Sequence, residues 1–179
     1  MFILIVGSGR VGSAVAKRAL DAGHEVSVLD SDPLSHERLD KDQLTTWEDA
    51  GGRFTVSTAL EIDGLIEAGI EQADVFVAAT SGDNTNLVIA QIAQRRFKVR
   101  RVVVRVADPG RASWYAEQGL LTICPTQVAI DEASRVGAGF VPKADSVIQP
   151  GDQVLLILDP GLEAQITPQF APNGASPQG

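Results

Sequence analysis

The residues with the clearest chemical potential form a glycine-rich run near the start of the chain. Gly7-Ser8-Gly9-Arg10-Val11-Gly12 has the spacing G-x-G-x-x-G and stands between an apolar run and an amphipathic helical pattern. Such glycines permit a tight strand-to-helix turn, let backbone approach a pyrophosphate, and let the helix pack closely on the strand. Because a helix N-terminus offers free N–H groups and partial positive charge, we predict a phosphate site here. The alternative is a turn that needs its glycines for geometry alone.

Two carboxylates and one guanidinium extend this predicted site. Asp30 ends the second apolar run, where nucleotide-binding folds carry an acid that accepts the ribose hydroxyls. Its charge opposes a 2′-phosphate, which favours NAD(H) or ATP/ADP over NADP(H). Asp32 either reaches ribose or adenine, or caps a helix before Pro33. A cation such as Arg10 is unfavourable at a helix N-terminus without an anion, so we favour a phosphate contact over a solvent-exposed arginine.

Further polar residues follow the predicted fourth and fifth strands. Thr80 and Ser81 come where the fourth strand ends, at the sheet edge where doubly wound folds bind ligands. The next polar residues are Asp83, Asn84 and Asn86, and capping of the following helix explains at least one of them. Arg105 lies inside an apolar run, where an unpaired charge is costly to bury. It therefore either reaches a sheet edge or meets an anion.

The sequence shows no recognisable set of catalytic residues beside the predicted nucleotide site. Short-chain reductases and sugar epimerases use a tyrosine with a lysine four residues later, but the single tyrosine, Tyr115, is followed at that position by Gly119. Two histidines and one cysteine are too few for a His/Cys metal cluster, so we predict no metal site. We expect no catalytic residues and favour a sensor. The alternative is a small NAD-dependent oxidoreductase or epimerase.

Composition and sequence pattern argue against several other classes of protein. The chain has 179 residues, and its 23 acidic against 15 basic residues give a net charge of −8, which is unfavourable for a general nucleic-acid binder. It contains no apolar run of the roughly 20 residues that cross a bilayer. It also begins directly with an apparent strand, so we expect a cytoplasmic protein without a signal peptide. A basic run at 95–101 is interpreted as a helix C-terminus, with an acidic partner or anionic lipid as the alternative.

Apolar β-branched runs alternate with helical patterns, which predicts an α/β fold with a Rossmann-like doubly wound parallel sheet. The expected strands are Phe2–Val6, Glu25–Asp30, Arg53–Val56, Asp74–Ala79, Arg101–Val106 and Leu120–Cys124. Helices are expected between them, including one from Asn84 to Arg95 and one opened by Pro109. The polar segment 31–52 is unusually long for such a link and is interpreted as an insertion, helical from Pro33 to Leu39 and anchored by Trp47.

The C-terminal region departs from this alternation. A helix is expected over Thr126–Ala138, followed by a small β-hairpin that turns at Pro150-Gly151. The chain from Pro160 onward is rich in Pro, Gly, Gln and Ser. The predicted organisation is a nucleotide-binding domain over 1–139, a hairpin extension over 140–159 and a disordered tail over 160–179.

A combination of motifs resembles the RCK (KTN) N-terminal domain, or TrkA-N domain, of regulatory subunits in Trk-type potassium uptake systems. The resemblance covers about Met1–Ala138. It is carried by the glycine run with Arg10, by Asp30 and Asp32, by Leu65–Ile70 before Ala73-Asp74, by Thr80 with Asp83–Leu87, by Arg105 and by Asp108-Pro109. It implies ligand contacts at Gly7, Gly9, Arg10, Gly12, Asp30, Asp32, Thr80 and Arg105. It also implies a homodimer or ring in which the helix Thr126–Ala138 crosses to a neighbour.

One departure concerns the residues after the third strand. The family usually carries Gly-Asp-Ala-Thr there, whereas this chain has Ser57-Thr58-Ala59-Leu60. The usual aspartate contact near adenine is thus missing, and we place Thr58, whose hydroxyl can substitute, and Ala59 in the predicted site. The function implied by the resemblance is a nucleotide-binding regulatory subunit that gates a membrane potassium transporter. It would lie at the inner face of the membrane when bound to that transporter.

Overall fold

A parallel sheet of six strands forms the centre of the computed structural model, which describes residues 1–135. The strands are β1 (Phe2–Val6), β2 (Glu25–Asp30), β3 (Arg53–Val56), β4 (Val75–Ala78), β5 (Arg101–Arg105) and β6 (Leu121–Ile123). Their order is β3-β2-β1-β4-β5-β6, and all five pairings are parallel. The predicted doubly wound sheet is therefore confirmed, with strand ends within one residue of those expected.

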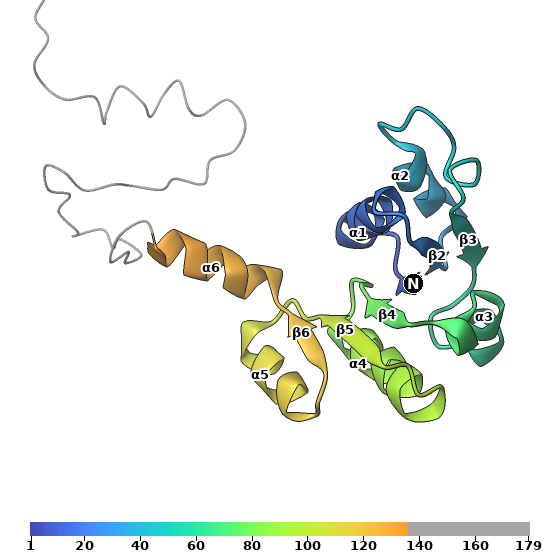
Figure 1. Cartoon of the computed structure of the whole chain (residues 1–179). Coiled ribbons are helices and arrows are strands. Elements are labelled where there is room, and N and C mark those ends of the chain that lie inside the picture. Colours follow the sequence, from blue (N-terminus) through green and yellow to red (C-terminus); the bar gives the residue numbers. More distant parts are fainter. Residues whose placement is uncertain (136–179) are drawn as a thin grey trace, which may run out of the picture. The chain divides into compact units, whose positions relative to one another are not determined.

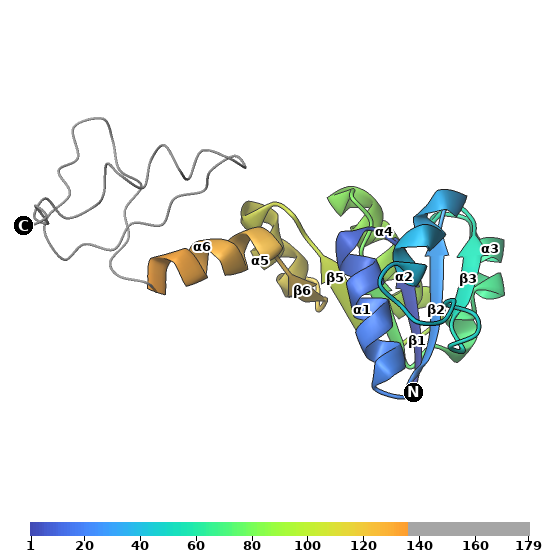
Figure 2. The ribbon, with the colours of Figure 1, turned by 90° about the horizontal axis from the view of Figure 1, so that it is seen from above.

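Helices cover both faces of this sheet (Figures 1 and 2). They are α1 (Arg10–Asp21), η1 (Pro33–His36), α2 (Glu37–Asp40), α3 (Ile62–Glu67), η2 (Ile70–Gln72), α4 (Asp83–Gln91), η3 (Ile92–Arg96), α5 (Pro109–Glu117) and α6 (Pro125–Arg135). One apolar core packs α1 and α2 on the sheet, and the other packs α3, α4 and α5 on the opposite face. Since both faces are covered, every residue of β1 is buried, as its continuous apolar sequence predicts.

The predicted insertion between β2 and β3 folds back onto the first of these cores. Its helical part is η1 followed by α2, close to the predicted Pro33–Leu39. Trp47 is 2 % exposed, and its indole Nε1 donates a hydrogen bond to the Arg53 carbonyl oxygen at 3.1 Å. A side chain at Gly52 would overlap this indole ring. The predicted role of Trp47 as the anchor of the insertion is therefore confirmed.

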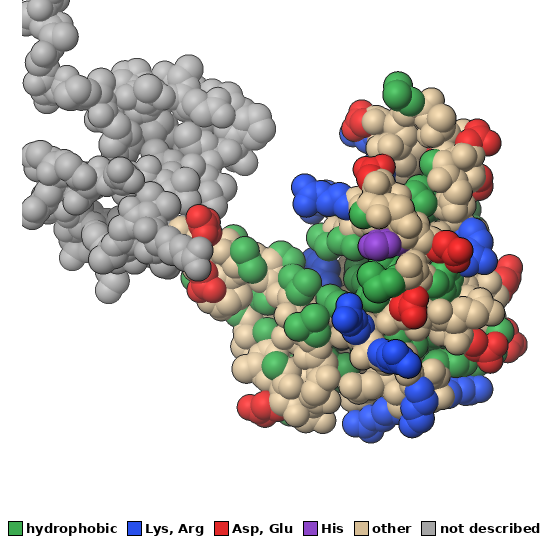
Figure 3. All heavy atoms as spheres, viewed as in Figure 1, with side chains coloured by type: hydrophobic (Ala, Val, Ile, Leu, Met, Phe, Trp, Pro, Cys, Tyr) green, Lys and Arg blue, Asp and Glu red, His purple; other side chains and the backbone are tan. Residues whose placement is uncertain are grey.

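The helix predicted from Asn84 to Arg95 is interrupted. Regular α-helix ends at Gln91, and a wider π-type turn, η3, continues to Arg96. Arg95 and Arg96 occupy the last turn, as expected for cations near helix carbonyls. Figure 3 shows Lys and Arg side chains gathered over this end of the helix.

The remaining expectations concern the chain beyond the sheet. One compact unit, Met1–Ala129, contains all six strands, and a second begins at Ile130. The helix predicted over Thr126–Ala138 is observed as α6, Pro125–Arg135. The predicted hairpin and tail lie outside the described residues. Within residues 1–135, no helix has the length and apolar character needed to cross a bilayer.

Candidate functional site

The glycine run forms the turn between β1 and α1. Gly7 has φ of +103°, and a Cβ there would lie 2.7 Å from the backbone of Ala79 and Thr80. A Cβ at Gly12 would lie 1.8 Å from the Gly7 carbonyl oxygen. A Cβ at Gly9 would meet no atom within 4 Å. Gly7 and Gly12 thus serve close packing, whereas the space over Gly9 is open.

The start of α1 is available to an anion. The helix begins at Arg10, with Gly9 in the N-cap position and without a side-chain cap. The first N–H groups of a helix have no partner within it, and its N-terminus carries partial positive charge. Backbone donors therefore point toward the open space beside Gly9, as a phosphate site requires.

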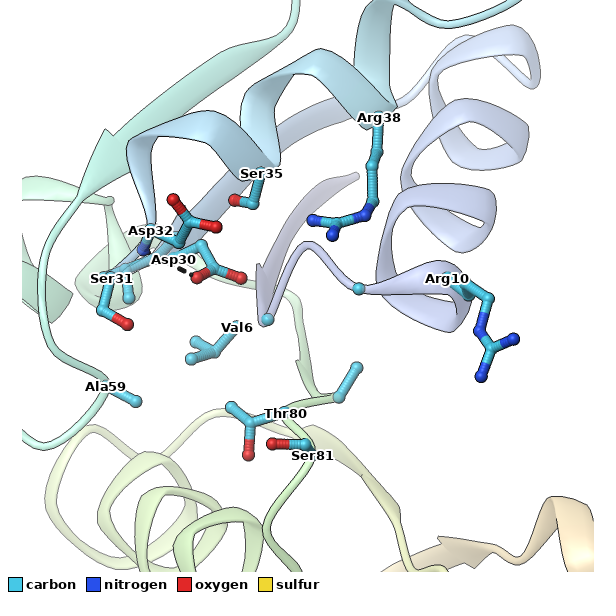
Figure 4. Close-up of a pocket in the computed structure, with 14 residues that line it drawn as sticks. Val6, Arg10, Asp30, Ser31, Asp32, Ser35, Arg38, Ala59, Thr80 and Ser81 are labelled. Carbon is cyan, nitrogen blue, oxygen red and sulfur yellow. Dashed lines mark hydrogen bonds between the residues drawn. The ribbon is translucent and has the colours of Figure 1, made fainter.

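A hollow of about 380 Å³ opens at this point, between the carboxyl ends of β1, β2 and β4 (Figure 4). In this strand order, β1 and β4 mark the place where the winding of the sheet reverses, and ligands of doubly wound folds bind there. Eight predicted site residues line it: Gly7, Gly9, Arg10, Asp30, Asp32, Ala59, Thr80 and Ser81. Five do not: Ser8, Val11, Gly12, Thr58 and Arg105.

Backbone donors hold the two carboxylates at the end of β2. Asp30 accepts hydrogen bonds from the Ser8 N–H at 2.6 Å and the Asp32 N–H at 3.0 Å. Asp32 accepts from the Leu34 N–H at 2.9 Å and is the N-cap of η1. The capping alternative for Asp32 is thus realised, and the residue also lines the hollow. Because a carboxylate has about four lone-pair sites, Asp30 retains capacity to accept from a ligand hydroxyl.

The carboxyl end of β4 is organised by one buried amide. Asn86 accepts from the Thr80 N–H and hydroxyl at 3.0 and 2.7 Å, and donates to the Thr80 and Arg105 carbonyl oxygens at 3.1 and 2.9 Å. Arg105 in turn donates to the Thr80 carbonyl oxygen at 3.0 Å. This carbonyl partner of Arg105 was not foreseen, because the predicted alternatives were a sheet edge and an anion. Sequence reasoning treated Asn86 as a capping candidate and missed this role.

The expectation that capping of α4 explains one of the polar residues 83–86 is wrong. Gly82 is the N-cap, and no side chain caps the helix. Asp83 instead accepts hydrogen bonds from the Ala107 and Asp108 N–H groups at 2.8 and 3.1 Å, because the turn after β5 runs beside the start of α4. The Asp83 carboxylate therefore holds the turn after β5 against the start of α4, at the carboxyl edge of the sheet.

Three lining residues come from the insertion and were missed by sequence reasoning: Ser31, Ser35 and Arg38. The Ser8 hydroxyl donates to the Ser35 carbonyl oxygen at 3.2 Å, which ties the glycine turn to η1. The Ser35 hydroxyl is buried and has no hydrogen-bond partner among the described residues. Figure 4 shows the Arg38 guanidinium extending from α2 toward the glycine turn. No sequence signal marked these residues, because they belong to a segment without a motif.

The opposite wall is formed after β3. Ala59 lines the hollow, whereas Thr58 is exposed and lies outside the lining. The Ser57 hydroxyl lies 3.2 Å from Oε2 of Glu61 and is engaged there. The wall near Ala59 therefore presents a small apolar side chain and no carboxylate.

A histidine network fixes the insertion next to the hollow. His36 Nδ1 lies 3.3 Å from the Asp40 carboxylate, and Nε2 lies 2.7 Å from Glu48. The sequence predicted no metal ligands, and this group of one histidine and two carboxylates was not foreseen. Each ring nitrogen faces a different carboxylate, so the group is already paired within itself. We interpret it as a polar network that joins α2 to the loop before β3.

Comparisons with known proteins agree with this geometry. The family model of the TrkA-N domain matches residues 3–124. A Trk system potassium uptake protein TrkA of Streptomyces coelicolor is 40 % identical over 135 residues, covering 75 % of this chain and 57 % of the relative. The chain spans about half the length of the curated relatives it matches.

Solved structures share the fold. A Kef C-terminal domain of Shewanella denitrificans in AMP-bound form aligns with a TM-score of 0.61 and 23 % identity, over 75 % of this chain and 79 % of that one. A GsuK channel bound to NAD aligns with a TM-score of 0.59 and 20 % identity, over 74 % and 23 % of the two chains. At these identities the likeness concerns the fold alone.

Proposed function

This chain belongs to the TrkA-N domain family, and from that premise we propose that it is a nucleotide-binding regulatory component of a Trk-type potassium uptake system. In this proposal it binds NAD(H) or ATP/ADP and gates a membrane potassium transporter from the cytoplasmic side, as a homodimer or a larger ring. The relatives named for that system are about twice as long as the matched region. The partner transporter, the transport of potassium and the oligomeric assembly are therefore proposed for this chain.

One observation carries the nucleotide-binding proposal: an uncapped helix start faces a hollow that contains unused polar groups. The α1 N-terminus lacks a side-chain cap. The buried Ser35 hydroxyl lacks a partner among the described residues, and a buried polar group without a partner is costly unless a ligand supplies one. Within residues 1–135, Arg10 and Arg38 line the hollow without an ion pair to any carboxylate. The α1 N–H groups, the Ser35 hydroxyl and the Arg38 guanidinium suit a phosphate or a ribose hydroxyl, whereas Figure 4 shows the Arg10 side chain extending away from Asp30.

Asp30 supports the choice among nucleotides. It lies at the end of β2, where it can accept ribose hydroxyls, and its charge repels a 2′-phosphate. AMP and NAD in the two structural relatives are consistent with adenine nucleotides in general. We therefore propose NAD(H), ATP or ADP as ligands, with NADP(H) disfavoured.

A regulatory role is favoured over catalysis. The hydroxyl of Tyr115 donates to the Asp83 carbonyl oxygen at 3.2 Å and does not line the hollow. Neither His24 nor His36 lines it. Gating then requires that a nucleotide bind the conducting and the non-conducting state with different affinities, with a coupling of about 1–3 kcal/mol. A substrate-dependent change in nicotinamide absorbance would instead support the oxidoreductase or epimerase alternative.

Calorimetric titration of the full chain with NADH, NAD⁺, ATP, ADP and NADPH tests the proposal. We expect binding of the nucleotides without a 2′-phosphate and weak binding of NADPH. Asp30→Ala should weaken binding by about ten- to hundredfold, because it removes a charged acceptor for the ribose hydroxyls. The control Asp49→Ala, at an exposed position outside the hollow, should bind as the parent does. If no nucleotide binds the parent chain, the glycine turn is structural and the proposal fails.

Arg38 provides a second test, aimed at the phosphates. Its guanidinium extends toward the glycine turn from an exposed position, so Arg38→Gln should leave stability nearly unchanged. We expect affinity for ADP and ATP to fall by about tenfold, because charge-assisted hydrogen bonds to phosphate are lost. Adenosine should bind equally to both forms. Arg18→Gln, on α1 outside the hollow, is the matched control, and an equal loss for adenosine and ADP would contradict a phosphate role.

A further inference from the structure

A cluster of basic side chains lies at the amino edge of the sheet, whereas the hollow lies at the carboxyl edge. This cluster consists of the side chains Arg95, Arg96, Lys98, Arg100 and Arg101, and is called here the basic edge. All five are exposed. They hold one third of the 15 basic residues of the chain within seven positions, although the net charge is −8. The surrounding chain is thus strongly acidic, and the basic edge is a local reversal of sign.

Helix-end electrostatics account for only part of this surface. Arg95 and Arg96 lie in the last turn of η3, where cations are favourable. Lys98 lies beyond the helix end, Arg100 directly precedes β5, and Arg101 is the first residue of β5, so helix-end carbonyls do not explain these three cations. Lys98 also has φ of +56°, in the left-handed region that favours glycine. A lysine therefore occupies a turn position at which glycine would cost less.

The five cations are free to meet an external anion. Across the described part of the chain, none of them forms an ion pair with a carboxylate. Asp74, which precedes Val75, the strand partner of Arg101, uses one carboxylate oxygen to accept from the Phe2 N–H at 2.8 Å. The guanidinium of Arg96 lies over the half-buried Phe97 ring, 5.5 Å from its centroid.

The position of the basic edge separates it from the nucleotide hollow. All strands run in the same direction, so the start of β5 lies at the amino edge of the sheet and the hollow lies at the carboxyl edge. None of the five cations lines that hollow or the smaller one bounded by α1 and the insertion. Five exposed cations without carboxylate partners offer the charge that an anionic lipid surface attracts.

We propose that the basic edge binds the anionic lipid surface of a membrane. Its relevance in the cell rests on the proposed function, which places the chain beside a membrane transporter. Contact through the amino edge leaves the nucleotide hollow open to solution, and the acidic remainder of the chain is repelled by the same lipids. The basic edge therefore also orients the domain, because it holds the densest cluster of cations among the described residues.

Vesicle co-sedimentation of the full chain tests the proposal. We expect binding to vesicles that contain phosphatidylglycerol, none to phosphatidylcholine alone, and a loss of binding as salt is added. Lys98→Gly should weaken binding roughly fivefold, and Arg100→Gln with Arg101→Gln more strongly. Because glycine fits the left-handed backbone, Lys98→Gly should not lower stability, so unfolding does not explain its loss. Arg111→Gln, at the carboxyl edge, should bind as the parent does.

Three outcomes would overturn the proposal. They are an absence of phosphatidylglycerol-dependent binding, binding that the basic-edge variants leave unchanged, and binding to polyglutamate without binding to vesicles, which would indicate an acidic protein partner. Nucleotide titrations of the same variants keep the two proposals separate. Loss of vesicle binding with normal nucleotide affinity would affirm the lipid contact, and failure of the parent to bind nucleotide would refute the proposed function alone.

Discussion

Gly12→Ala is expected to lower the free energy of unfolding by about 3 kcal/mol or more, a large share of the roughly 5–15 kcal/mol of an ordinary domain. The added Cβ would lie 1.8 Å from the Gly7 carbonyl oxygen, which is backbone and cannot rotate away. Either α1 must move off β1 or the turn at Gly7 must open. Urea unfolding followed by the fluorescence of the buried Trp47 would measure the loss.

Gly9→Ala separates binding from folding and is the matched control. Gly9 has φ of −70°, and an added Cβ meets no atom within 4 Å, so stability should change by about 1 kcal/mol at most. The new methyl group occupies the space beside the α1 N-terminus where a pyrophosphate would approach. We expect nucleotide affinity to fall by at least about tenfold, or 1.4 kcal/mol. Unchanged affinity in Gly9→Ala would show that the nucleotide binds elsewhere.

The parts of the fold that the sequence predicted have local causes. Each strand is a short apolar run bounded by breakers, and each face of the sheet requires a helix, so the alternation of patterns predicts the architecture. The glycine turn and Asp30 were equally visible, because the proposed nucleotide site is marked by residue type and spacing. Trp47 was visible as the one large aromatic side chain of a polar segment, and such a side chain is expected to find a core.

The parts that were missed depend on contacts distant in sequence. Arg38 lies at the hollow because the insertion folds back over α1, and nothing in its local sequence specifies that path. Asn86 resembles a helix-capping residue in sequence, yet its amide bridges β4 and β5. A polar residue next to a helix start has several possible partners, and only packing selects among them. The π-type turn at η3 likewise has no distinct sequence pattern.

Replacement of Asn86 is expected to be the most damaging polar substitution in the described domain. The side chain is fully buried, and Asn86→Ala would leave the Thr80 N–H and the Arg105 carbonyl oxygen without their partner. A buried group left unsatisfied costs about 1–3 kcal/mol, so we expect a loss of about 3 kcal/mol in the free energy of unfolding. Asn84→Ala is the control, because that exposed side chain accepts only from Arg111 and should cost less than about 0.5 kcal/mol.

Asn86→Asp distinguishes hydrogen bonding from packing. In its ionised form aspartate has nearly the same shape and can still accept from the Thr80 N–H and hydroxyl, but it cannot donate, so the comparison is made at a pH where the carboxyl group is ionised. Its second oxygen would face the carbonyl oxygens of Thr80 and Arg105, to which the amide Nδ2 donates at 3.1 and 2.9 Å. If the donated bonds hold the ends of β4 and β5 together, Asn86→Asp will destabilise the domain as much as Asn86→Ala. Stability close to that of the parent would show instead that shape alone is required. Because Thr80 lines the nucleotide hollow, we also expect both variants to weaken nucleotide binding in calorimetry at temperatures where they remain folded.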